Sequence, residues 1–358
     1  MKTYDQGASI FTLRIGANNN MTLKLSILDQ SPIQEGETAT EAFLHTIALV
    51  KKAEELGYHR FWVSEHHDLD HVVGSSPEVL IAHLLAKTER IRIGSGGVML
   101  QHYSPYKVAE NFHVLASLAP GRVDLGIGRA PGGLPLSTKA LQQESTGTNR
   151  TLAEKLEELE HFLHDELIPA HSLYGLKVIP TPPEPADLFL LGTSIESAEL
   201  AASRGIPYVF ALFINHDETV SQAAMEAYRK QFRPGRIANP QALLALSVIV
   251  ADTEEEAAQL AKESKVAKIH LQSGKTVTVT SLKKAEEFGL QSVEPYTIEV
   301  KEANVIHGTK DTVRKKLIAI QDQYDIEEVI ITAPIKDFQK RMLSYERLRE
   351  AFSELTVS

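Results

Sequence analysis

The chain has 358 residues, of which 43% are hydrophobic and 23% charged, so it can bury one large core. Its formal net charge of −10 argues against a nucleic-acid partner, because a phosphate backbone requires clustered lysines and arginines. The sequence contains no cysteine, which excludes disulfide scaffolds and thiolate metal sites. It also has no apolar run near the roughly 20 residues that cross a bilayer. We therefore expect a cytoplasmic protein without a membrane segment.

Residues 1–20 precede the first patterned segment and contain no signal-peptide core, so we expect a loosely ordered N-terminal extension to a domain of residues 21–358. From residue 23 onward, short apolar runs alternate with amphipathic stretches. The predicted strands are Leu23–Leu28, Arg60–Val63, Ile91–Met99, Val123–Ile127, Leu188–Leu191, Tyr208–Leu212, Leu243–Val250 and Glu328–Thr332. The predicted helices are Thr40–Leu56, Ser76–Thr88, Pro105–Leu118, Arg150–Leu167, Ser194–Ser203, Glu218–Gln231, Thr253–Lys262, Lys310–Gln323 and Lys336–Leu355. Residues 264–304 are polar and interrupt this alternation, and we interpret them as an insertion.

Strict alternation of strands and helices requires parallel strands joined by crossover helices, in either a closed barrel or a doubly wound sheet. Eight strands and the absence of a linker favour a single-domain α/β structure, a (β/α)₈ TIM barrel with an insertion late in the barrel. In such barrels the chemistry lies at the C-terminal ends of the strands. The segments that follow each strand are therefore the candidate site.

The densest of these segments is Ser64-Glu65-His66-His67-Asp68, directly after the second strand. A metal site with His71 as a third ligand is one interpretation, but adjacent residues at a strand end point in opposite directions and no second ligand cluster has zinc spacing. The histidines are alternatively ordinary loop residues, with Glu65 satisfying a neighbour. We favour a histidine that handles a proton or polarises a substrate, since imidazole titrates near neutral pH, and we predict no metal.

Two glycine-rich stretches, residues 94–97 and 126–133, lie at the C-terminal ends of the third and fourth strands. Neither matches the G-x-G-x-x-G pattern that opens a helix, which argues against a dinucleotide-binding Rossmann site. Glycine at a strand end instead allows a flat ligand to approach the backbone closely, although turn glycines are the simpler explanation.

Arg129 lies at the tip of the fourth strand, where its planar guanidinium is suited to a phosphate. A surface ion pair is the competing interpretation. Gly192-Thr193-Ser194 ends a strand and opens a helix, and hydroxyl groups with free N–H groups at a helix N-terminus form an anion site. Thr193 or Ser194 is alternatively a simple N-cap, and both roles are compatible.

Several blocks of the sequence, taken together, resemble the bacterial luciferase-like flavin-dependent monooxygenases, especially uncharacterised bacterial members. The blocks are residues 61–67 (FWVSEHH), 93–98 (IGSGGV), 121–129 (GRVDLGIGR), 191–194 (LGTS) with 197–202 (SAELAA), and 204–207 (RGIP). The resemblance implies a (β/α)₈ barrel that binds reduced FMN supplied by a separate flavin reductase. It also implies that O₂ adds to the flavin, giving a hydroperoxide that oxidises a small organic substrate.

Carried over by position, His66 matches the active-site histidine of the family, expected to stabilise the hydroperoxide or to act as an acid or base, with Glu65 and His67 beside it. Arg129, Gly192, Thr193 and Ser194 match the region that binds the flavin phosphate. Gly96 and Gly97 match a non-proline cis peptide against which the flavin ring packs. The insertion at 264–304 corresponds to a mobile lid that shields the site from water.

The resemblance has departures and leaves alternatives. Gly128 and Thr193 stand where luciferase carries a cysteine and a glutamate, which argues against long-chain aldehyde chemistry and light emission. A deazaflavin-dependent hydride-transfer enzyme and a non-catalytic flavin-binding protein remain open, as does a barrel hydrolase built on Asp29 and Glu65. By likeness to relatives we expect a homodimer that uses the helix at 40–56 or the one at 76–88.

Overall fold

The computed structural model describes residues 22–143, 150–274, 276–279 and 282–353. The predicted N-terminal extension, residues 1–20, lies outside the described residues. Within them, no helix combines the length and the apolar character needed to cross a membrane.

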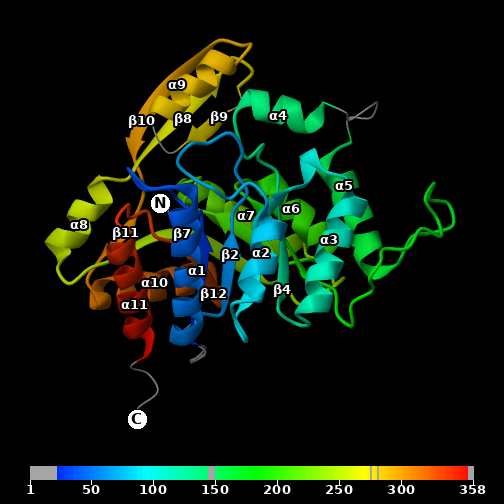
Figure 1. Cartoon of the computed structure of the whole chain (residues 1–358), viewed down its shortest axis with the longest axis horizontal. Helices are drawn as coiled ribbons and strands as arrows, with labels where there is room; N and C mark the ends of the chain where they lie inside the picture. The colour runs from blue at the N-terminus through cyan, green and yellow to red at the C-terminus, as the bar shows by residue number, and fades with distance from the viewer. Residues whose placement is uncertain (1–21, 144–149, 275, 280–281, 354–358) are drawn as a thin grey trace, which may run out of the picture.

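Eight parallel strands close into a barrel, which confirms the predicted fold (Figure 1). Their order is β1-β2-β3-β4-β5-β6-β7-β12, and β12 pairs again with β1. A short strand, β11, pairs with β7 outside this ring. The bounds are β1 Lys24–Asp29, β2 Arg60–Val63, β3 Arg92–Met99, β4 Val123–Gly128, β5 Asp187–Gly192, β6 Tyr208–Ala211, β7 Ala242–Val250, β11 Ile306–Gly308 and β12 Glu328–Thr332.

The helices lie around the outside of the barrel, and each predicted helix is found within a few residues of its expected ends (Figure 1). Local signals explain their limits: Thr38 and Glu41 form a reciprocal capping box at the start of α1, and Gly57 ends the helix with a left-handed φ of 76°. The bounds are α1 Ala39–Leu56, α2 Pro77–Leu85, α3 Pro105–Leu118, α5 Leu152–His164, α6 Ile195–Arg204, α7 Glu218–Gln231, α8 Glu254–Lys262, α10 Lys310–Tyr324 and α11 Phe338–Ser353.

Two cores hold the barrel, because successive residues of a strand point to opposite faces. On β2, Phe61 and Val63 belong to the large apolar layer between strands and helices, whereas Trp62 belongs to a smaller cluster formed by alternate strand residues. That smaller cluster fills the inside of the barrel and consists of Leu28, Trp62, Phe189, Val209, Leu243, Ala245 and Ile330.

A buried ion network lies at the opposite end of the barrel from the candidate site, where the strands begin. Arg60 donates to Glu328 Oε1 at 2.6 Å and to Asp124 Oδ2 at 2.8 Å. Asp124, which is fully buried, also accepts from Trp62 Nε1 at 2.9 Å and from Arg92 Nη2 at 2.6 Å. The buried charges at this end of the barrel are paired with one another, so the network has a structural role.

The described residues of 265–302, which follow α8, form a small unit outside the barrel. It is an antiparallel sheet with the strand order β10-β8-β9, together with the helix α9. Figure 1 places these elements beyond one end of the barrel, beside α4. They have their own apolar core, to which Leu69 and Leu134 of the barrel loops contribute. The bounds are α4 Pro135–Gln142, β8 Lys265–Leu271, β9 Thr276–Val279, α9 Leu282–Gln291 and β10 Tyr296–Glu302.

Candidate active site

His66 follows β2 and faces a cavity of about 540 Å³ at the C-terminal end of the barrel. Its backbone N–H donates to Gly74 O at 2.8 Å, and its Nδ1 lies 3.0 Å from Ser64 Oγ. Burial, together with the nearby rings of His71 and His67, lowers the pKa of His66 to about 4. The ring is therefore neutral at physiological pH and offers a hydrogen-bonding nitrogen rather than a charge.

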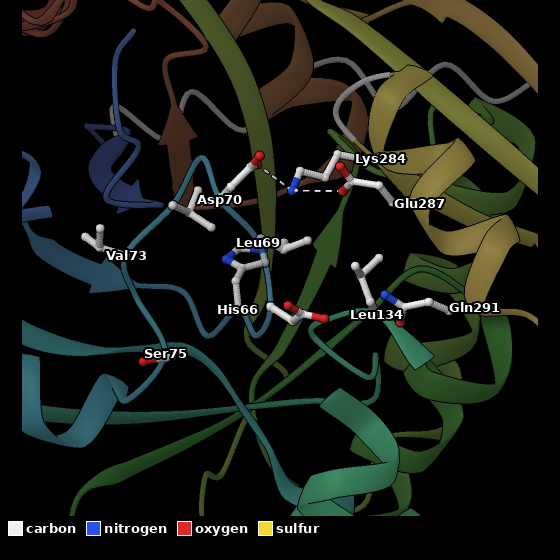
Figure 2. Close-up of a pocket in the computed structure, with 11 residues that line it drawn as sticks. His66, Leu69, Asp70, Val73, Ser75, Leu134, Lys284, Glu287 and Gln291 are labelled. Carbon is white, nitrogen blue, oxygen red and sulfur yellow. Dashed lines mark ion pairs between the residues drawn. The ribbon is translucent and has the colours of Figure 1, made fainter. Parts of the chain in front are cut away.

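Three separate parts of the chain form the walls of this cavity: the loop after β2, Leu134 just before α4, and α9. The loop after β2 contributes apolar side chains, including Leu69 and Val73, and α9 of the insertion contributes polar ones (Figure 2). The lining residues are His66, Asp68, Leu69, Asp70, Val72, Val73, Ser75, Leu134, Lys284, Glu287 and Gln291. Sequence analysis gave a specific role only to His66 among them, although Asp68, Leu69 and Asp70 lie in the candidate segment after β2 and the α9 residues lie in the predicted insertion.

An ion cluster joins the insertion to the β2 loop at the rim of the cavity. Lys284 Nζ lies 2.7 Å from Asp70 Oδ1 and 3.6 Å from Glu287 Oε2, and Figure 2 shows it between the two carboxylates. Lys283 pairs with the same Asp70 from the solvent side, at 3.0 Å. Hydrogen bonds from Lys284 and Lys283 hold the pKa of Asp70 well below its usual range, so this carboxylate stays ionised across the physiological range.

Glu65 and His67 form a different group, as expected for neighbours that point in opposite directions. Glu65 is fully buried and accepts from His67 Nε2 at 2.7 Å, Tyr103 Oη at 2.8 Å and Met99 N at 3.0 Å. Neither Glu65 nor His67 lines the cavity of His66. The contacts of Glu65 instead tie the β2 tip to the segment that follows β3.

Asp29, the other carboxylate considered for a hydrolase, is also buried and accepts hydrogen bonds from groups of the protein. It accepts from Thr46 Oγ1 at 2.7 Å and from the backbone of Ser31 at 3.3 Å. Since the protein's own donors hold both carboxylates, the geometry does not favour a catalytic pair. Among the residues that the structure describes, no group of three or more His, Asp or Glu side chains is arranged to hold a metal ion.

The peptide bond between Gly96 and Gly97 is cis, as the family resemblance implied. Crowding explains both glycines: a Cβ on Gly96 would lie 2.8 Å from Leu28 Cδ1, and one on Gly97 would lie 2.7 Å from Gly126 O. Gly192 is equally constrained, because its Cβ would lie 2.0 Å from Ser197 Oγ. Packing within the barrel therefore requires glycine at these positions.

The predicted phosphate region lies at the N-terminus of α6. Ser194 is the N-cap of this helix, since its side chain accepts from Ser197 N, and Thr193 O accepts from Asn215 Nδ2 at 2.9 Å. The N-cap interpretation thus holds for Ser194. Arg129 is exposed at the end of β4, and its charge acts on Glu196 in the first turn of α6.

Glu196 lies in the segment after β5 that belongs to the candidate site, but sequence analysis assigned it no role of its own, because it reads as an acidic residue in a first helical turn. Its pKa is lowered, chiefly by a hydrogen bond from the Ser194 side chain and in smaller part by the charge of Arg129. The structure therefore brings Arg129, Ser194 and a carboxylate into one neighbourhood. An anion at this helix end would meet two attractive groups and one repulsive group.

Comparisons with known proteins identify relatives of the chain. The family model described as luciferase-like monooxygenase matches residues 23–325. N-acetyl-S-alkylcysteine monooxygenase of Bacillus subtilis (strain 168) is 47% identical over 329 residues, covering 92% of this chain and 98% of that protein.

Solved structures show the same relationship. The structure of apo-MsnO8 covers 94% of this chain and 99% of its own, with a TM-score of 0.76 and 35% identity. The oxygenating constituent of 3,6-diketocamphane monooxygenase from Pseudomonas putida, in complex with FMN, shares the fold with a TM-score of 0.62 at 18% identity, over 92% of this chain and 98% of its own. From the family match and the extent of these similarities, the chain belongs to the luciferase-like monooxygenases.

Proposed function

We propose that the protein is a flavin-dependent monooxygenase that takes reduced FMN from a separate reductase and uses O₂ to oxidise an N-acylated S-alkylcysteine. The observation that carries this proposal is the neutral His66 on the wall of a cavity of about 540 Å³ that α9 helps to enclose. The relative named for that substrate class is 47% identical over nearly its whole length, which supports the choice of substrate.

The residues around the barrel mouth suit FMN in charge and in position. Arg129 offers an exposed guanidinium to the phosphate, and the N-terminus of α6 adds a partial positive charge. Glu196 opposes them and would have to turn away from an arriving phosphate. FMN, when bound and reduced, would supply the activation of O₂, while the protein binds and orients the reactants.

His66 acts on the substrate side of this site. The Ser64 hydroxyl engages Nδ1, so Nε2 is the atom at which His66 gives or accepts a hydrogen bond. A pKa of about 4 makes the ring a weak base, suited to orienting a reactant rather than to storing a proton. Helix α9 of the insertion forms part of the cavity wall, and exclusion of water there would favour oxidation of the substrate over loss of reduced cofactor.

The test is oxygen uptake by the purified protein with FMN, a flavin reductase, NADH and N-acetyl-S-methylcysteine. We expect oxygen uptake above the substrate-free rate, with matching loss of the thioether in chromatography. Flavin binding without this uptake would indicate a non-catalytic flavin-binding protein, and turnover only with reduced deazaflavin would indicate hydride transfer. A His66→Ala variant should bind FMN as the wild type does and lose most of its turnover, whereas full activity would remove His66 from the mechanism.

A further inference from the structure

Two adjacent lysines on α9 hold the same carboxylates but differ in their surroundings. The side chain of Lys284 is 4% exposed and lines the cavity, whereas that of Lys283 is 70% exposed. Both pair with Asp70, at 2.7 and 3.0 Å, and both lie 3.6 Å from Glu287. Lys283 can therefore keep both carboxylates neutralised from the solvent side while Lys284 interacts with a molecule in the cavity.

The cavity wall carries one cation, Lys284, among its lining residues, together with three carboxylates, Asp68, Asp70 and Glu287. A count of charges would predict a preference for cations. The acidic groups, however, are more exposed: Asp70 is 60% exposed, Glu287 is 32% exposed, and Asp68 is also exposed. Water screens exposed charges far more than buried ones, so Lys284 contributes the least screened charge to the interior.

The geometry points to Lys284 as the specificity-determining residue that binds the carboxylate of the substrate. This inference rests on the proposed function, because it takes the cavity beside His66 as the substrate site. Figure 2 shows Lys284 and His66 reaching the cavity from different elements, α9 and the β2 loop. The apolar side chains of Leu69, Val73 and Leu134 lie in the same wall and suit an alkyl group. The preferred ligand is thus an organic anion with an apolar substituent.

Lys284 can bind a substrate carboxylate although it is already paired with Asp70. Asp70 has a second partner in Lys283, whose Nζ lies 3.0 Å from Asp70 Oδ2. A substrate carboxylate can therefore join Lys284 without leaving Asp70 unpaired. Burying the substrate carboxylate next to a buried ammonium forms a charge-assisted hydrogen bond, the strongest kind available in this cavity.

The experiment compares Lys284→Met with its matched neighbour Lys283→Met on two substrates, N-acetyl-S-methylcysteine and its carboxamide. For Lys284→Met, the KM of the acid should rise by about 10-fold or more, the loss expected for a charged hydrogen bond, with kcat within about 2-fold. The KM of the carboxamide should change by less than about 2-fold on the same scale. Lys283→Met removes only the solvent-side partner of Asp70, so it should raise the KM of the acid by less than Lys284→Met does and leave the KM of the carboxamide unchanged. Equal effects on acid and amide would overturn the inference, as would a preference of the wild type for an amine analogue.

A second measurement separates this inference from the proposed function. Calorimetric titration of acid and carboxamide onto the protein reports binding without turnover. Tighter binding of the acid, lost in Lys284→Met, supports the inference even if neither compound is oxidised, a result that would contradict only the proposed function. Equal binding of the two compounds by the wild type overturns the inference. If Lys284→Met fails to fold, Asp70→Asn serves instead: it removes the resident partner and should lower the Kd of the acid alone, and an unchanged Kd counts against the role of Lys284.

Discussion

The lowered pKa of His66 makes a specific prediction about stability and pH. Above the ordinary histidine value of 6.5 the ring is neutral in both the folded and the unfolded chain, so it adds no pH dependence. As the pH falls toward about 4, the unfolded chain takes up a proton that the folded chain does not. The free energy of unfolding must therefore fall across this window, and the slope ends below about pH 4.

The magnitude follows from the two pKa values. Each pH unit between 6.5 and about 4 corresponds to about 1.4 kcal/mol, so the whole window carries about 3 kcal/mol. Between pH 7 and pH 5, His66 should lower the free energy of unfolding by about 2 kcal/mol. Replacing His66 with glutamine removes the titration and keeps a polar group beside Ser64, so the variant should lack this part of the pH dependence.

The assay is chemical denaturation of wild type and His66→Gln at several pH values between 5 and 8. Trp62 is the single tryptophan and is fully buried, so its fluorescence reports global unfolding. Other histidines with lowered pKa values titrate alike in both proteins and cancel in the difference. Parallel curves for the two proteins would refute the argument, because they would mean that His66 titrates normally in the folded chain.

Two further regions of the protein give predictions. Asp124→Asn should lower the free energy of unfolding by about 3–5 kcal/mol, because it leaves the buried Arg60 short of a counter-charge. Asp252→Asn, which breaks an exposed ion pair with Arg347, should lower the free energy of unfolding by less than about 1 kcal/mol. Equal losses for the two variants in chemical denaturation would contradict a stabilising role for the buried ion network around Asp124. Arg129→Ala should raise the Kd for FMN several-fold, about 1 kcal/mol, since its guanidinium is exposed and screened; an unchanged Kd in fluorescence titration would exclude it from the phosphate site. Glu196→Gln should lower that Kd by removing a competing charge, and weaker binding would show that the carboxylate organises the site instead.

Much of the barrel was predictable because its elements carry strong local signals. The eight strands are short apolar runs bounded by glycine, proline or charged residues, and the helices have clear periodicity. Helix α4 was not predicted because none of its side chains is buried, so it has no apolar stripe to detect. The strand β11 has only three residues, too few for a pattern.

The site was predictable only in part, for a different reason. The rule that chemistry lies after barrel strands pointed to His66, which does face the cavity. Lys284 reaches the same cavity from an insertion whose packing depends on loops far away in the sequence. The resemblance placed the insertion over the site, but no local pattern shows which of its side chains face the cavity, and a lysine followed by acidic residues on a helix reads as a solvated face.

The shared side chains at the top of the barrel have a consequence for evolution and engineering. Leu69 and Leu134 line the cavity and also belong to the small apolar core of the insertion. A substitution that makes room for a bulkier molecule in the cavity therefore also removes packing from the insertion beside it. Variants selected for larger substrates should need compensating changes in the sheet of the insertion. The range of substrates and the stability of the insertion should therefore change together.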